Sequence, residues 1–206
     1  MFFILEYWPL FLQQKVAFIF SRSGFSLMGG LLGVPIYAFL RLRSLNVPFL
    51  LFSDIVSSKI PPFQAIARFG CLFVGCCVGD YCYQDTSLFC VIYNHPHCLA
   101  PLGIPLLPLQ LISALCSIII FFTLGYLRQT KQYPQGFIFA TYLIMEGLAR
   151  TATDFWRLER NIILNTDFLW PISYAQVIGM FMLLTGTILL VFVLQRKNKS
   201  HHNHKP

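Results

Sequence analysis

Long runs of apolar residues, separated by short polar or charged stretches, dominate the sequence. A transmembrane helix needs about 20 mostly apolar residues, and two uncharged runs of that kind, residues 105–127 and 174–194, predict the clearest membrane spans. Residues 24–40 form a shorter run rich in glycine, and residues 136–155 form a fourth run that is apolar in its first half. The pattern predicts an all-α membrane protein built as a polytopic helical bundle.

A fifth segment, residues 47–69, is apolar but interrupted by charged residues and two prolines. Irregular backbone is tolerated at membrane depth only where protein or water covers its freed polar groups, so we expect a broken or re-entrant segment around Pro61 and Arg68. The first 20 residues carry two charges and a proline and lack the basic start of a signal peptide. We expect them to form an interfacial or partly inserted segment.

Basic residues follow the first, third and last of these spans: Arg41 and Arg43, then Arg128 and Lys131, then Arg196, Lys197 and Lys199. Cytoplasmic loops carry the excess of Lys and Arg, so the pattern predicts five spans with the N-terminus outside and the C-terminus in the cytoplasm. Residues 1–195 then form a single transmembrane helical domain, and residues 196–206 form a basic cytoplasmic tail.

Composition supports this picture and excludes other classes of protein. Apolar residues make up 56% of the 206-residue chain and charged residues only 11%, against roughly 25% charged residues in soluble domains. The formal net charge is +7, but four of the 15 Lys and Arg residues lie in the last eleven positions. The chain therefore has no basic face for nucleic acid, and a soluble cytosolic enzyme is excluded.

The seven cysteines follow no convincing zinc-ligand spacing. Four of them lie in apolar stretches, where cysteine commonly packs as a small apolar residue: Cys71, Cys76, Cys77 and Cys116. Cys82, Cys90 and Cys98 fall in a loop that is predicted to face outward, and they can oxidise if that side is the periplasm.

Ionisable residues close to the fourth span indicate either a structural ion pair or a site. Arg150, Asp154 and Arg157 are spaced i, i+4 and i+7, which places them on one helix face. One interpretation is an Arg–Asp pair with a second arginine that extends to the interface. The other is capture of an anionic lipid head group by the spare guanidinium.

Arg68 is the second unusual charge, because no carboxylate occurs within ten residues of it and Gly70 and Gly79 follow. Such an arginine suits bidentate binding of phosphate. Gly29 and Gly30 either bring another backbone to the same place or only allow helices to pack closely. Together these residues predict an outward-facing cavity that binds a phospholipid head group.

Several short motifs occur in order along the chain: Ser-Leu-Met-Gly-Gly-Leu-Leu-Gly from Ser26, Ala-Arg-Phe-Gly-Cys-Leu-Phe-Val-Gly from Ala67, Pro-Leu-Gln-Leu from Pro108, Arg-Thr-Ala-Thr-Asp-Phe-Trp-Arg from Arg150, and Ser173 with Gln176. They resemble the motifs of the prolipoprotein diacylglyceryl transferase family. The family's versions read Ser-Phe-His-Gly-Gly-Leu-Ile-Gly, Gly-Arg-x-Gly-Asn-Phe-x-Asn-Gly, His-Pro-x-Gln-Leu-Tyr-Glu, Arg-Phe-x-x-Glu-Phe-x-Arg and Ser-x-x-Gln. The resemblance covers most of the chain.

The resemblance implies an enzyme of the bacterial inner membrane that transfers a diacylglyceryl group from phosphatidylglycerol to the lipobox cysteine in a prolipoprotein signal peptide, releasing glycerol phosphate. It implies catalytic roles for Arg150 and for Asp154, which stands where the family has glutamate. It implies head-group binding by Arg68, Gly29, Gly30, Gly70, Gly79, Gln110 and Arg157. No metal or organic cofactor is implied.

The chain also departs from the family pattern. Met28 and Leu107 stand in the places of two motif histidines, and Cys71, Val74 and Cys76 replace two asparagines and a glutamate. The first motif arrives within the opening 30 residues, so the family's N-terminal helices are expected to be missing. Two alternatives therefore stay open: a catalytically impaired phospholipid-binding protein with the same fold, and a membrane thiol oxidoreductase that uses the paired cysteines at positions 76 and 77.

Overall fold

The computed structural model describes residues 27–82, 90–129, 133–158, 162–166 and 169–202. The chain divides into two compact units, Met1–Phe49 and Leu50–Pro206, and each is described by itself. The segment predicted to be interfacial, within the first 20 residues, lies outside the described residues.

The described part of the first unit is dominated by helix α3, Leu27–Ser44. This confirms the helix predicted at residues 24–40 and extends it by four residues. Arg41 and Arg43 lie in its last turn, where cations interact favourably with the helix dipole. The Ser44 hydroxyl donates a hydrogen bond to the Arg41 carbonyl at 2.7 Å, which satisfies one of the free carbonyls at the helix end.

The predicted fifth segment consists of two helices, α4 (Phe49–Ser57) and α5 (Ile60–Val74), which two residues separate. Pro61 and Pro62 occupy the first positions of α5, where a missing N–H group costs no hydrogen bond. The expected break is therefore present but lies before Pro61. The segment is thus interrupted beside Lys59 and the two prolines, while residues 61–68 themselves are helical. A re-entrant course through the membrane stays a prediction.

Three longer helices follow: α6 (Leu109–Gln129), α7 (Phe137–Asp154) and α8 (Tyr174–His202). They confirm the helices predicted in these regions, and α8 continues past residue 194 into the predicted basic tail. Among the described residues, α6 and the Tyr174–Lys197 part of α8 are long and apolar enough to cross a membrane. The molecule is thus a mostly helical protein of membrane type, and five crossings remain a prediction.

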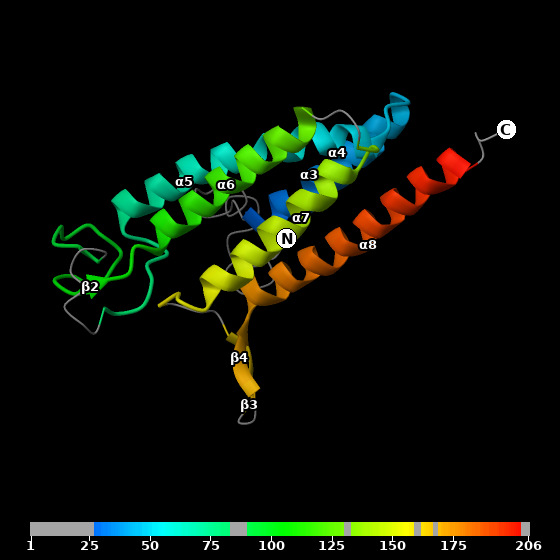
Figure 1. Ribbon diagram of the computed structural model, residues 1–206. Coiled ribbons are helices and arrows are strands. Elements are labelled where there is room, and N and C mark those ends of the chain that lie inside the picture. Colours follow the sequence, from blue (N-terminus) through cyan, green and yellow to red (C-terminus); the bar gives the residue numbers. More distant parts are fainter. Residues whose placement is uncertain (1–26, 83–89, 130–132, 159–161, 167–168, 203–206) are drawn as a thin grey trace, which may run out of the picture. The chain divides into compact units, whose positions relative to one another are not determined.

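Helices α5, α6, α7 and α8 pack in chain order, each against the next (Figure 1). The contact between α6 and α7 contains a buried apolar cluster made of Ile120, Leu124, Ile138 and Tyr142. Large apolar side chains also point away from the helices, including Phe122 on α6 and Phe181 and Leu184 on α8. Apolar residues on both faces of a helix are typical of helices surrounded by lipid.

Glycines allow α7 and α8 to approach closely. A Cβ atom on Gly147 would lie 2.7 Å from the Gly179 carbonyl oxygen, and one on Gly186 would lie 2.9 Å from Ile144 Cγ1 and 3.0 Å from the Ala140 carbonyl oxygen. Small residues at a helix–helix contact are the usual means of close packing within a membrane. Any larger side chain here would push the two helices apart.

The start of α7 is held by a residue from α4. Asp54 accepts hydrogen bonds from the Gly136 N–H at 2.6 Å and the Phe139 N–H at 2.8 Å. A carboxylate at a helix N-terminus satisfies free N–H groups and interacts favourably with the helix dipole. Asp54 therefore performs the capping role for a helix that begins more than 80 residues later in the chain.

Two small antiparallel sheets lie at the end of the helices where α5 and α7 end and α6 and α8 begin (Figure 1). In the first, β1 (Val91–Ile92) pairs with β2 (Pro105–Leu106), and in the second, β3 (Ile162–Thr166) pairs with β4 (Leu169–Ser173). The expectation of an all-α chain is corrected here. The two-residue strands β1 and β2 are too short to give a hydrophobic alternation, and the five-residue strands β3 and β4 do not alternate strictly.

Candidate functional site

The turn that follows α5, residues 75–80, is held between two other segments of the chain. The Gly79 N–H donates to the Leu107 carbonyl at 2.9 Å, and the Asp80 N–H donates to the Trp156 carbonyl at 2.8 Å. A Cβ atom on Gly79 would lie 2.8 Å from both Cβ and the carbonyl oxygen of Leu107, and 3.1 Å from the Trp156 carbonyl oxygen. Glycine is therefore required at this position for the three segments to meet.

Arg157, which lies 80 residues after Cys77 in the sequence, contacts this turn. Its backbone forms an antiparallel bridge with Gly79, and its Nη2 donates to Cys77 Sγ at 3.2 Å. The prediction that Arg150, Asp154 and Arg157 share one helix face was wrong for Arg157, because α7 ends at Asp154. The guanidinium reaches the turn after α5 instead.

Asp154 connects the end of α7 to the beginning of α8. Its carboxylate accepts a hydrogen bond from the hydroxyl of Ser173. The Gln176 N–H donates to Ser173 Oγ and the Ser173 N–H donates to Gln176 Oε1, each at 3.2 Å; this reciprocal pair is a capping box. The three residues are only 4%, 1% and 2% exposed. The Ser-x-x-Gln motif is therefore the start signal of α8.

Arg68 and Arg150 lie on two helices, α5 and α7, that are joined by a polar side-chain contact. Gln64 Nε2 on α5 donates to Glu146 Oε1 on α7 at 3.1 Å. Arg68 lies four residues after Gln64, and Arg150 four residues after Glu146, so each arginine shares a helix face with the contacting residue. Both helices run toward the same end of the unit (Figure 1). The two arginines, both half-buried, therefore lie one helical turn beyond the Gln64–Glu146 contact. They lie between that contact and the end of the helices at which residues 75–80 are found.

Gln110, at the start of α6, lies beside the same turn. Its side chain is 1% exposed, and its Nε2 donates to the Cys76 carbonyl at 2.8 Å. The amide group thus links α6 to the turn after α5. Gln110, Gly79 and Arg157, three of the candidate residues, therefore all lie in or contact the turn at residues 75–80.

Several buried polar atoms near these residues lack a hydrogen-bond partner. Among the described residues they are Gln64 Oε1, Gln110 Oε1, Arg157 Nε and Gln176 Nε2. Buried polar groups in proteins are nearly always hydrogen-bonded. These atoms, which lie beside the Gln64–Glu146 contact and near the helix ends, are suited to hydrogen bonds with a polar ligand.

Two ionisable groups beside the turn are held in their neutral forms. Burial, together with the neighbouring Cys71 and Cys77 thiols, raises the pKa of the Cys76 thiol to about 11. Burial also raises the pKa of the Tyr93 hydroxyl, which donates to the Leu72 carbonyl at 3.1 Å. Since the thiolate is the nucleophilic form of cysteine, Cys76 is a poor nucleophile at neutral pH.

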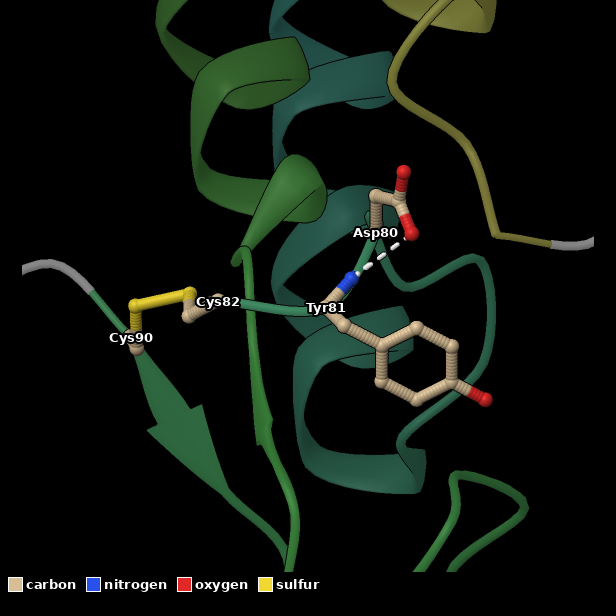
Figure 2. The surroundings of a disulfide bond; sticks show 4 residues. All are labelled: Asp80, Tyr81, Cys82 and Cys90. Atoms are coloured by element: carbon tan, nitrogen blue, oxygen red, sulfur yellow. Dashed lines mark hydrogen bonds between the residues drawn. A yellow bond between two sulfur atoms is a disulfide. The ribbon is translucent and has the colours of Figure 1, made fainter. Parts of the chain in front are cut away.

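The loop that continues from this turn contains a disulfide between Cys82 and Cys90 (Figure 2). The Cys82 N–H donates to the Pro105 carbonyl in β2 at 3.0 Å, and Cys90 directly precedes β1. Of the three cysteines expected to be open to oxidation, Cys98 is a free thiol. In the same view, the Asp80 carboxylate accepts a hydrogen bond from the Tyr81 N–H at 2.8 Å.

The remaining candidate residues are distributed over both units. A Cβ atom on Gly70 would meet nothing within 4 Å, so packing within the described chain does not require glycine there. Gly29 and Gly30 lie in α3, in the other unit, and their part in head-group binding stays a prediction. Leu107, in the place of a motif histidine, uses its backbone to hold the turn at residues 75–80.

Comparison with known proteins identifies the family to which these motifs belong. The family model for prolipoprotein diacylglyceryl transferase matches residues 1–192. The chain belongs to this family.

Relatives within the transferase family cover most of the chain. Two proteins of Dehalococcoides mccartyi, both named phosphatidylglycerol–prolipoprotein diacylglyceryl transferase, are 29% and 30% identical to it. Their alignments include 96% and 95% of this chain and 72% and 71% of the relatives. A Clostridium tetani protein of the same name is 29% identical over 86% of this chain and 66% of its own length.

Sequence reasoning about this transferase chain missed Gln64 and gave no role to Glu146. Glu146 was visible as a carboxylate within an apolar run, which is unusual enough to mark a site. Gln64 carries no charge and lies 82 positions away, so only the packing of α5 beside α7 reveals it. A polar residue one helical turn before a candidate arginine is the signal that was available.

Proposed function

We propose that this chain transfers a diacylglyceryl group from phosphatidylglycerol to the lipobox cysteine of a prolipoprotein, in the cytoplasmic membrane of a bacterium. The observation that carries the proposal is the Gln64–Glu146 hydrogen bond at 3.1 Å. It joins α5 to α7 one helical turn before Arg68 and Arg150, each of which lies on the same helix face as the hydrogen-bonded residue of its helix. Two guanidinium groups from distant parts of the sequence are thereby available to one phosphate.

The chemistry is a displacement at a glyceryl carbon. The sulfur of the lipobox cysteine forms a bond to that carbon, the carbon–oxygen bond to phosphate breaks, and glycerol phosphate leaves with the electron pair. The thiol loses its proton in the same process. Arg68 and Arg150 bind the phosphodiester and stabilise the charge that develops on its oxygens, as fixed donors aimed at developing charge do in general.

Other residues have supporting roles in this proposal. Gln110 and Arg157, each with a buried polar atom that has no partner among the described residues, contribute donors and acceptors for the glycerol part of the head group. Gly79 allows their segments to meet, and Gly70 leaves space beside Arg68. Gly29 and Gly30 are retained as a backbone surface for the lipid.

Asp154 is proposed as a positioning residue. It is 4% exposed and hydrogen-bonded to Ser173, so it holds the last turn of α7, one turn beyond Arg150. A shift of a catalytic group by about 1 Å can reduce a rate by about 100-fold. Fixing the helix end is therefore enough to make Asp154 important for transfer without contact to the substrate.

The proposed topology has the turn at residues 75–80 and both small sheets on the outer side of the membrane, with the C-terminus in the cytoplasm. The Cys82–Cys90 disulfide supports this orientation, because structural disulfides persist in oxidising compartments such as the periplasm. A lipobox cysteine that emerges on that side would meet the arginines from the same direction.

The test is transfer in cells depleted of their own transferase, followed as the change in gel mobility of a reporter lipoprotein. We expect the wild-type chain to restore modification. Arg68→Ala and Arg150→Ala should each reduce the rate by about 100-fold or more, while Arg43→Ala, at an exposed arginine near the end of α3, should leave it unchanged.

Two results would overturn the proposal. If the wild-type chain inserts stably and retains phosphatidylglycerol but the reporter stays unmodified, the chain is a phospholipid-binding relative without transferase activity. If it modifies the reporter equally well with alanine at position 68 and at position 150, the phosphate is bound elsewhere.

A further inference from the structure

We propose that Cys71, Cys76 and Cys77 form a binding site for a soft monovalent metal ion, of which copper(I) is the natural example. Their three sulfur atoms lie within 4.8 Å of one another, and all three side chains are half-buried. The site adjoins the proposed head-group site, with which it shares Arg157 and Gln110, but its test measures metal binding and does not depend on transfer activity.

The local backbone explains how the three thiols converge. Gly75 ends α5 with a φ of 74°, and the N–H groups of Gly75 and Cys76 both donate to the Cys71 carbonyl, at 2.9 and 3.1 Å. These two hydrogen bonds turn the chain back toward the last turn of α5. Cys77 then has a φ of 59°, a left-handed conformation that non-glycine residues rarely adopt. Simple apolar packing does not require a cysteine in that conformation.

The turn that carries two of the thiols is fixed from several directions. Gln110 donates to the Cys76 carbonyl at 2.8 Å, and Gly79 is held against Leu107 at 2.9 Å. A site whose ligands are already positioned loses less entropy when the ion binds. The sulfur atoms therefore need only small movements to surround one ion.

The donor set determines the class of metal. Thiolates are soft ligands that select copper(I), zinc or iron–sulfur clusters over magnesium or calcium. Structural zinc is almost always bound by four ligands in a tetrahedron, whereas the described residues supply a group of three sulfurs here. Three thiolates around one ion suit copper(I).

Arg157 supplies the compensating charge. Its Nη2 lies 3.2 Å from Cys77 Sγ, and its Nε is buried without a partner among the described residues. Each thiol that binds the ion gives up its proton to solvent, so the loaded site is negatively charged. A guanidinium placed on one of the sulfurs stabilises that charge. Because the ion displaces protons from its ligands, binding should weaken as the pH falls.

The first experiment is a titration of the purified full-length chain, in detergent and fully reduced under anaerobic conditions, with copper(I) buffered by a chromogenic chelator. We expect one copper(I) per chain and ultraviolet absorption from thiolate–copper charge transfer. Cys71→Ser, Cys76→Ser and Cys77→Ser should each lower the affinity by at least about tenfold. Cys116→Ser, at a half-buried cysteine in α6, is the matched control and should bind as the wild type does.

A second measurement uses the unaltered chain, so that a variant that fails to fold does not decide the result. Copper(I) should protect Cys71, Cys76 and Cys77 from alkylation, as followed by mass spectrometry, and should leave Cys98 and Cys116 as reactive as in the metal-free protein. Equal protection of all five free thiols would overturn the proposal. So would failure of the reduced wild type to take copper(I) from the chelator, or a preference for zinc(II) at the same cysteines.

Discussion

The carboxylate of Asp154 on the last turn of α7 accepts a hydrogen bond from the hydroxyl of Ser173, the residue directly before α8. Both residues are nearly completely buried. Nineteen positions separate them in the sequence, and the β3–β4 hairpin occupies most of that interval. The pair therefore fixes the end of α7 relative to the beginning of α8, independently of the conformation of the hairpin.

Replacing Ser173 with alanine should destabilise the protein. The variant loses the N-cap of α8, worth about 1 kcal/mol, and leaves the buried Asp154 carboxylate without this donor, which costs a further 1–3 kcal/mol or so. We expect a lower midpoint of thermal unfolding in detergent and faster hydrogen exchange in the first turn of α8. Thr187→Ala removes an exposed hydroxyl on the same helix and should change neither. An unchanged midpoint for Ser173→Ala would mean that the contact is not formed in solution.

Replacing Gln64 with alanine should reduce transfer without unfolding the protein. Loss of the hydrogen bond to Glu146 frees α5 to shift against α7, and the two arginines then no longer meet one phosphate in the same geometry. We expect kcat to fall by about 10- to 100-fold with little change in the thermal midpoint, measured with purified protein and labelled phosphatidylglycerol. Gln129→Ala, at an exposed residue at the end of α6, is the control. If Gln64→Ala has the kcat of the wild type, the Gln64–Glu146 hydrogen bond does not position the two arginines.

Two glycines should respond to alanine in opposite ways. Gly79→Ala places a methyl group 2.8 Å from the backbone of Leu107 and should destabilise the fold by about 1–3 kcal/mol. Gly70→Ala adds a methyl group that meets nothing within 4 Å in a helix interior, and should stabilise it by about 0.5–1 kcal/mol. If Gly70 leaves room for the lipid, its variant will also bind phosphatidylglycerol more weakly while unfolding at a higher temperature. Stabilisation with unchanged lipid binding would show that Gly70 has no part in the site.

Removing the Cys82–Cys90 disulfide should destabilise the loop before β1. The eight-residue separation of these cysteines corresponds to about 2–3 kcal/mol of loop-closure entropy. Cys82→Ser with Cys90→Ser should therefore increase proteolytic cleavage in this loop. Cys98→Ser, which removes a free thiol, should not. If both cysteines react with a maleimide in unreduced protein from intact cells, the loop does not face an oxidising compartment.

The reactivity of Cys76 should depend on pH in a characteristic way. With a pKa of about 11, about one thiol in a thousand is ionised at pH 8, so alkylation should be slow and its rate should rise about tenfold per pH unit up to pH 10. The sign follows from the thiolate being the reactive form, which burial disfavours. The rate for free N-acetylcysteine, measured in parallel, should level off at a lower pH than that for Cys76, because its thiol is not buried. A Cys76 rate that levels off at the same pH would contradict the raised pKa.

Helices could be predicted from the sequence because each is a long apolar run that ends near charged or turn-forming residues. The family could be recognised from motifs that are local in sequence, and the start of α8 is one of them. The interruption before Pro61 could be predicted because proline is tolerated in the first turn of a helix but breaks a helix interior. The first sheet was missed because its two-residue strands carry no periodicity, and the second because its five-residue strands do not alternate strictly between apolar and polar residues.

The contacts of the site could not be predicted in the same way. Gln64 and Glu146 are 82 residues apart, and Arg157 and Cys77 are 80 apart; no spacing rule connects such pairs. Arg157 was placed on the wrong surface because α7 ends earlier than a continued i, i+4, i+7 pattern implies. The cysteines at positions 71, 76 and 77 match no standard ligand spacing, and only the left-handed residues at positions 75 and 77 bring them together.

The cap that Asp54 provides to α7 has a mechanical consequence for the gap between α4 and α5. On one side of the gap α4 is tied to the first turn of α7, and on the other side α5 is tied to the middle of α7 through Gln64. Bending at the gap would stretch one of these ties or curve α7 itself. The two hydrogen-bonded contacts therefore restrict bending between α4 and α5. A displacement of α4 would be transmitted through α7 to Arg150.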